Sequence, residues 1–89
     1  MDLKLKYIRC KRFNEIIVFP ELLEHSEFQG FEPIGAGFCW VDTRKMQVKC
    51  YGESVSLKLK SHPEADSYWA TKYFFGEDAA EEMITRQPI

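Results

Sequence analysis

Five side chains in this 89-residue sequence could serve as nucleophiles, general bases or soft metal ligands. They are Cys10, Cys39, Cys50, His25 and His62. No cysteine belongs to a Cys-x-x-Cys pair, and these ligand types never recur at the short paired spacing of structural zinc sites. We therefore expect no metal and no cofactor. The three cysteines should be small buried hydrophobic residues, and both histidines should be exposed.

Cys10 is the strongest candidate for a reactive group. Its basic neighbours Arg9, Lys11 and Arg12 would favour the thiolate. Catalysis also needs a matched base and an orienting group, and the sequence offers no such set. Segment 52–56 approaches a Gly-x-Ser-x-Gly nucleophile elbow but ends in serine, where the strained turn requires glycine. We therefore predict that the protein is not an enzyme. If it were one, Cys10 would be the best candidate for the nucleophile.

One set of aromatic and basic side chains rises above this background. It consists of Phe38, Trp40, Lys49 and Tyr51. Exposed rings beside lysine can stack on the bases of single-stranded nucleic acid, and aromatic residues are also enriched at protein interfaces. These four are the predicted binding residues. The alternative is that another element covers the rings and that they are purely structural.

The elements that would position this set follow from local patterns. We expect strands over 3–7, 15–19, 36–41, 46–51 and 54–60, and helices over about 20–29, 63–75 and 77–86. Apolar residues alternate with polar ones in the strand segments. Pro20 suits the first turn of a helix, and Ser61 with Glu64 fits a capping box. The predicted class is α+β, a single domain of antiparallel hairpins or a β-meander with one or two helices packed on one face.

The second hairpin gives the sharpest prediction. Pairing Val41 with Met46 across a polar turn at 42–45 sets Cys39 opposite Val48. Because side chains alternate between the two faces of a strand, these four residues should be buried. Phe38, Trp40, Lys49 and Tyr51 would share the opposite face, and Ser54 and Ser56 would face solvent on the next strand.

The helix over 63–75 is the expected cover for the buried face. Its aromatic stripe would consist of Ala65, Tyr68, Trp69 and Tyr73, which recur at helical spacing. Gly76 should end this helix. The helix should therefore pack its rings on the sheet.

Composition narrows the class of protein further. Hydrophobic residues make up 45% and charged residues 29% of the chain, which is typical of a folded domain. The net charge of −2 is too small to indicate a nucleic acid or an anionic membrane as partner. No segment approaches the roughly 18 apolar residues that a membrane span needs, and three cysteines without paired spacing suit a reducing compartment. We expect a cytoplasmic protein that does not enter membranes.

Two strings carry a resemblance, one at 36–38 and the other at 50–57. They read AGF and CYGES-x-SL, and the FP and HS pairs around Phe19 and His25 extend the likeness over residues 7 to 66. In these strings the chain resembles small uncharacterised proteins encoded by bacteriophages and prophages. The resemblance implies an origin and attaches no chemistry to any residue. The chain departs from it after Asp66.

These observations favour a non-enzymatic interaction or regulatory accessory protein of phage or prophage type. Its partner would be another protein or a second copy of this chain. The alternative is a small module for single-stranded nucleic acid, in which Lys4, Lys6, Arg9, Lys58 and Lys60 would lie near the phosphates. Alternating acidic segments weaken that alternative.

Overall fold

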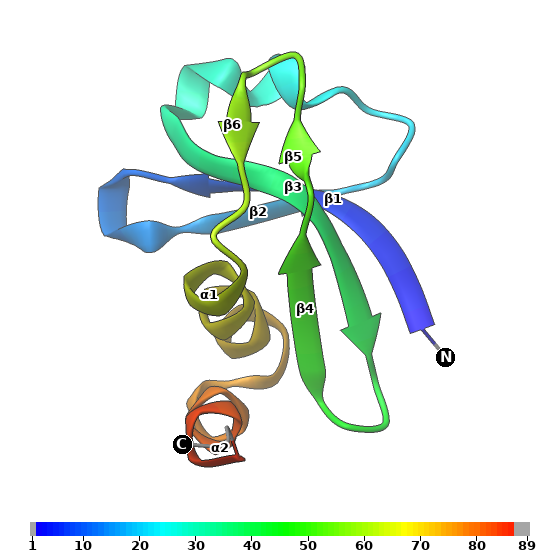
Figure 1. Cartoon of the computed structure of the whole chain (residues 1–89), viewed down its shortest axis with the longest axis vertical. Coiled ribbons are helices and arrows are strands. Elements are labelled where there is room, and N and C mark those ends of the chain that lie inside the picture. Colours follow the sequence, from blue (N-terminus) through cyan, green and yellow to red (C-terminus); the bar gives the residue numbers. More distant parts are fainter. Residues whose placement is uncertain (1, 87–89) are drawn as a thin grey trace.

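The computed structural model describes residues 2–86, which form a twisted four-stranded sheet with further elements on each face (Figure 1). The strands are β1 (Asp2–Cys10), β2 (Ile16–Phe19), β3 (Pro33–Asp42), β4 (Gln47–Tyr51), β5 (Glu53–Ser54) and β6 (Leu59–Lys60). The helices are the short 3₁₀ helices η1 (Arg12–Asn14) and η2 (His25–Phe31) and the α-helices α1 (Pro63–Phe75) and α2 (Glu77–Arg86). Among these residues, no helix has the length and hydropathy needed to cross a membrane.

The main sheet has four antiparallel strands in the order β2-β1-β3-β4, and β5 and β6 form a separate pair. This arrangement confirms the predicted α+β class. The first hairpin is confirmed too, with η1 forming its turn and β1 running on to Cys10. Because β1 is long, it pairs with β2 on one side and with β3 along its whole length on the other.

The β3–β4 hairpin has the predicted faces but a different register. Val41 pairs with Val48, and Cys39 pairs with Cys50. The shift is two residues, so the side chains of the paired residues stay on their predicted faces. The prediction was wrong for Met46, which lies in the turn with φ of 54° and is 48% exposed.

Helix α1 covers the face of the sheet that carries the paired cysteines, but it is rotated from the predicted orientation. The residues that it buries are Asp66, Ser67, Ala70 and Thr71. Two of the four predicted stripe residues lie outside this contact, because Ala65 is exposed and Tyr73 is 62% exposed. Trp69 still packs against the core, and α2 packs on α1.

Hydroxyl groups on α1 explain this rotation. The Val48 amide donates to Thr71 Oγ1 at 2.9 Å, and the Cys50 amide donates to Ser67 Oγ at 2.8 Å. These amides point away from β3, on the outer edge of the sheet. The helix thus satisfies an edge that would otherwise offer unpaired groups to another strand.

A buried carboxylate fixes the start of α1. Asp66 is fully buried, accepts hydrogen bonds from the Tyr7 hydroxyl and the His62 amide, and forms an ion pair with Arg9. Asp66 thereby satisfies an amide at the beginning of the helix. The predicted capping box of Ser61 and Glu64 was wrong, since the cap residue is His62.

The opposite face of the sheet is covered over only part of its length. Buried Ile8, Cys10, Phe19 and Ala36 pack there against Phe28 of η2 and Leu57 and Leu59 around β6. Segment 20–29, expected to be one helix, is a turn followed by η2. Glu24 and Glu27 form the capping box that starts η2, four residues after Pro20.

Burial of His25 was not expected from the sequence. It is 4% exposed, and its Nε2 donates to the Gly37 carbonyl at 2.8 Å. The ring lies edge-on to Phe19 and to Phe38, with centroids 5.4 Å and 5.9 Å away. His25 therefore anchors η2 on the sheet.

The strand predicted over 54–60 is interrupted by a turn. Ser54 is buried and its hydroxyl accepts a hydrogen bond from the Leu57 amide at 3.2 Å, while Val55 is 82% exposed. Lys58 has φ of 57°, which extended structure does not allow. The period-2 pattern was thus overridden by a local serine hydrogen bond.

The burial pattern of β3 and β4 predicts opposite outcomes for two truncations. Val48→Ala should lower the free energy of unfolding by about 1–3 kcal/mol, because it leaves a cavity beneath α1. Met46→Ala, in the exposed turn, should change it by less than about 0.5 kcal/mol. Urea denaturation of both variants measures the difference. Equal effects would show that the hairpin register is incorrect.

Candidate binding face

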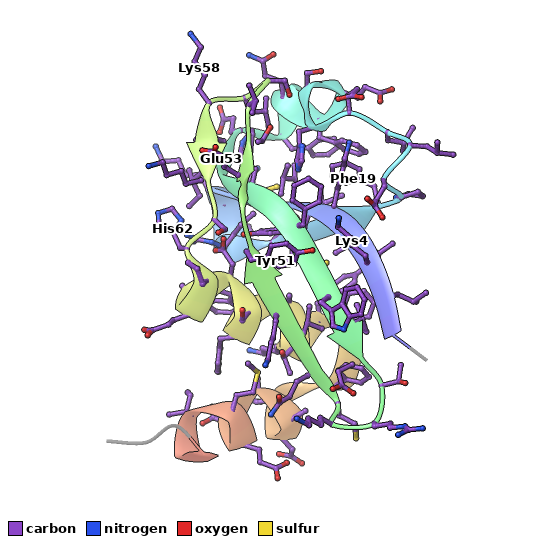
Figure 2. All side chains as sticks on the ribbon, turned by 45° about the vertical axis from the view of Figure 1, so that its right-hand side comes forward. Lys4, Phe19, Tyr51, Glu53, Lys58 and His62 are labelled. Carbon is purple, nitrogen blue, oxygen red and sulfur yellow. The ribbon has the colours of Figure 1, made fainter. Side chains whose placement is uncertain are left out.

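The face of the sheet opposite α1 carries the predicted binding residues together with two lysines of β1, of which Lys6 has only 12% of its side chain exposed. We call this set the aromatic–lysine platform. It comprises Lys4, Lys6, Phe38, Trp40, Lys49 and Tyr51. Figure 2 shows Lys4 on β1 and Tyr51 on β4, the two strands that flank β3.

Strand register arranges the platform in two rows. Trp40 pairs with Lys4 on one side and with Lys49 on the other. The second row places Phe38 between Lys6 and Tyr51. Each row therefore has an aromatic ring on the central strand β3, and Trp40 is flanked by a lysine on both sides.

Contacts within the platform hold its rings in place. The Phe38 and Tyr51 rings stack with their centroids 5.9 Å apart, and Lys4 Nζ lies 5.1 Å from the Phe38 centroid. His25 closes the far side of Phe38, which is half-buried. Phe38 thus supports Tyr51 and Lys4 from the side that faces His25. Trp40 and Tyr51, each 40% exposed, form its accessible surface.

Acidic residues from the segment after β2 line one side of the platform. Glu21 lies 3.7 Å from Lys4, and Glu24 lies 4.0 Å from Lys6, whose ammonium also donates to the Leu23 carbonyl at 2.8 Å. Lys49 is exposed and forms no ion pair within residues 2–86. No sequence pattern predicted that Glu21 and Glu24 would border this face, because the contact depends on how the segment after β2 folds back.

Two glycines allow the strands behind the platform to approach. A Cβ on Gly37 would lie 2.4 Å from the Tyr51 carbonyl oxygen, so no other residue fits there. Gly52 has φ of 79°, a conformation that favours glycine. The AGF and CYGES strings therefore meet in space, and both contribute to the platform.

A second polar cluster surrounds Asp66, and its contacts stabilise the fold. Burial and the hydrogen bond to Asp66 raise the pKa of Tyr7, which keeps its hydroxyl a donor at neutral pH. Arg9 and the His62 amide occupy the carboxylate as well. A surface hollow of about 450 Å³ lies beside the cluster and is lined by His62, Pro63, Glu64 and Ala65. Asp66 itself has no exposed surface from which to act on a ligand there.

Cys10 does not have the reactive character that its basic neighbours would favour. It is 4% exposed, and burial, with a contribution from Glu15, raises its pKa. A thiol in such a site is predominantly protonated at neutral pH. All three cysteines are buried, as predicted. Among the described residues, no three Asp, Glu, His or Cys side chains are placed to share a metal ion.

Buried thiols and the Tyr7 phenol predict that stability falls in alkali. Burial raises the pKa of Cys39 to about 12 and also raises that of Cys50 and of Tyr7. In the unfolded chain these groups ionise near their ordinary values, 9.0 for thiols and 10.0 for Tyr7. The unfolded state therefore loses these protons first as the pH rises. The stabilisation that comes from burying the protonated groups is fully present below about pH 9 and is progressively lost above it.

Urea titrations under reducing conditions, from about pH 8 to pH 11, measure this decline, which can reach about 1.4 kcal/mol per pH unit for each group. Cys39→Ala and Tyr7→Phe should each reduce the slope, whatever their effect at neutral pH. A free energy of unfolding that stays constant or rises over this range contradicts the burial of these groups.

Comparisons with known proteins add no family to these observations. No protein-family model, no curated protein and no solved structure matches the chain.

Proposed function

We propose that this chain is a non-enzymatic accessory protein that binds another protein through the aromatic–lysine platform. One observation carries the proposal. The outer face of the sheet is covered by η2 and the β5–β6 pair over one part, and is left open where Trp40 and Tyr51 stand. Tryptophan and tyrosine are enriched at protein interfaces.

The surroundings of the platform favour a protein as the partner. Interfaces between proteins combine an aromatic centre with a polar rim of mixed charge. Here Glu21 and Glu24 stand beside Lys4 and Lys6. A phosphate backbone would have to displace these carboxylates, and it would meet a protein of net charge −2.

One observation supports single-stranded nucleic acid as the second candidate. Trp40 lies between Lys4 and Lys49 in the same row across three strands. A base stacked on the indole would bring its neighbouring phosphates within reach of both ammonium groups. This geometry makes the nucleic-acid alternative specific enough to test.

The phage or prophage origin is part of the same proposal. It is supported by the resemblance over residues 7 to 66, whose two strings supply Phe38 and Tyr51 to the platform. Three free, buried cysteines are consistent with action in the reducing cytoplasm of a host cell. A protein of this kind would modulate a host or phage protein by binding it.

Matched substitutions test binding through the platform. The bait is the full chain, and a captured protein is identified, purified and titrated against each variant. Trp40→Ser and, separately, Lys49→Glu should weaken binding by about tenfold or more, as expected for hot-spot residues. Tyr73→Ser should not, because Tyr73 is an exposed ring on α1, away from the platform.

Lys49→Glu separates a loss of binding from a loss of folding. Because Lys49 is exposed, its replacement should leave the melting temperature unchanged. Equal affinity for wild type, Trp40→Ser and Lys49→Glu would show that the partner binds elsewhere. Sedimentation of the chain alone tests whether the partner is a second copy. In that case the wild type would be a dimer and the platform variants would be monomers.

The nucleic-acid alternative predicts quenching of indole fluorescence by single-stranded DNA or RNA at low salt. Phosphate contacts would make the affinity fall as salt rises, and Trp40→Ser should abolish the response. Trp69 is the second tryptophan, so Trp69→Phe serves as the control that isolates the signal of Trp40. Absence of quenching at about 50 mM salt or below eliminates this candidate.

A further inference from the structure

The register of the β3–β4 hairpin brings two thiols together on the face opposite the platform. Cys39 and Cys50 are direct cross-strand partners, although the sequence had placed Val48 opposite Cys39. Both side chains point towards α1 and belong to one core cluster, with exposed fractions of 0% and 3%. Cys10 belongs to the cluster on the other face of the sheet.

The backbone between these cysteines has the geometry that a disulfide needs. The Cys50 amide turns outward to Ser67, so Cys39 and Cys50 form a pair that exchanges no backbone hydrogen bonds. In such antiparallel pairs the Cα atoms are about 4.5 Å apart. Disulfides span Cα separations of about 4.4–6.8 Å. The two residues therefore need side-chain rotation rather than movement of the strands.

We propose that Cys39 and Cys50 are a redox pair that closes to a reversible disulfide and locks the β3–β4 hairpin. The oxidant is a low-molecular-weight disulfide, such as glutathione disulfide. One cysteine thiolate attacks it, forms a mixed disulfide and releases one glutathione thiolate. The second cysteine thiolate displaces the other glutathione. The pair loses two electrons, glutathione disulfide gains them, and the two cysteine protons end on two glutathione thiols.

Burial controls when this reaction occurs. Burial raises the pKa of both thiols, and α1 covers them, so neither attacks an oxidant while the helix is seated. The reaction therefore requires local opening of α1 or of the hairpin. Exchange with glutathione runs in both directions, so reduced glutathione can open the disulfide again. The lock should accordingly be slow to form and reversible.

Forming the disulfide would also constrain two residues of the platform. Trp40 and Lys49 are the next cross-strand pair after Cys39 and Cys50. A covalent link one residue away prevents the two strands from separating at this point. This consequence concerns the hairpin alone and holds whether or not the platform has a partner.

The test uses the full chain in a series of glutathione buffers of increasing oxidised fraction. Reduced native protein is equilibrated in each buffer, and a second sample is refolded from urea in the same buffer, so that burial cannot hide the equilibrium. Remaining thiols are then alkylated in denaturant, and the mass is measured.

The oxidised wild type should carry one alkyl group instead of three and should weigh about 2 Da less before alkylation, for the two hydrogens lost. Cys10→Ser should carry none, whereas Cys39→Ser and Cys50→Ser should form no internal disulfide. Amide exchange of Trp40 and Lys49 should be slower in the oxidised protein.

Three outcomes overturn the proposal. They are three alkylated cysteines after both routes, a disulfide that includes Cys10, and amide exchange at Trp40 and Lys49 that oxidation does not slow.

Discussion

The rest of the structure depends on the contacts of the fully buried Asp66 carboxylate. A charge without solvent is tolerated only when it is paired and hydrogen-bonded, and Asp66 meets this condition through Arg9, the Tyr7 hydroxyl and the His62 amide. It ties the first turn of α1 to β1, one of the two inner strands of the sheet. Once this end is fixed, the helix must present Ser67 and Thr71 to β4 and direct Tyr73 to solvent.

This placement of α1 leaves open the platform, which is the surface that we propose binds a partner. The hydroxyls of Ser67 and Thr71 occupy the edge of β4, which cannot then accept an additional strand. On the other face, η2 and the β5–β6 pair cover one part of the sheet and stop at Phe38. In our proposal the partner contacts Trp40 and Tyr51 face-on and competes with Glu21 and Glu24 for the lysines of β1.

The β3–β4 hairpin serves two purposes with its two faces. One face supplies core residues and the adjacent thiols Cys39 and Cys50, and the other supplies Trp40 and Lys49. Since neighbouring residues on a strand point to opposite sides, a change in the core is separated from the platform by a single residue. The close approach at Gly37 adds to this coupling by fixing the hairpin against the Tyr51 carbonyl.

The sequence by itself determined the hairpins, the α-helices over 63–75 and 77–86, and which face of β3 and β4 is buried. These follow from local alternation and helix ends, and a register error of two residues does not disturb them. Tertiary structure alone decided the Cys39–Cys50 pairing, the burial of His25 and the rotation of α1. The burial of His25 and the rotation of α1 depend on contacts between elements, as in the hydrogen bond between Tyr7 and Asp66, 59 residues apart. The Cys39–Cys50 pairing depends on where the hairpin turn falls, which periodicity alone does not give. Periodicity reports which residues share a face, but it cannot report which groups will meet across that face.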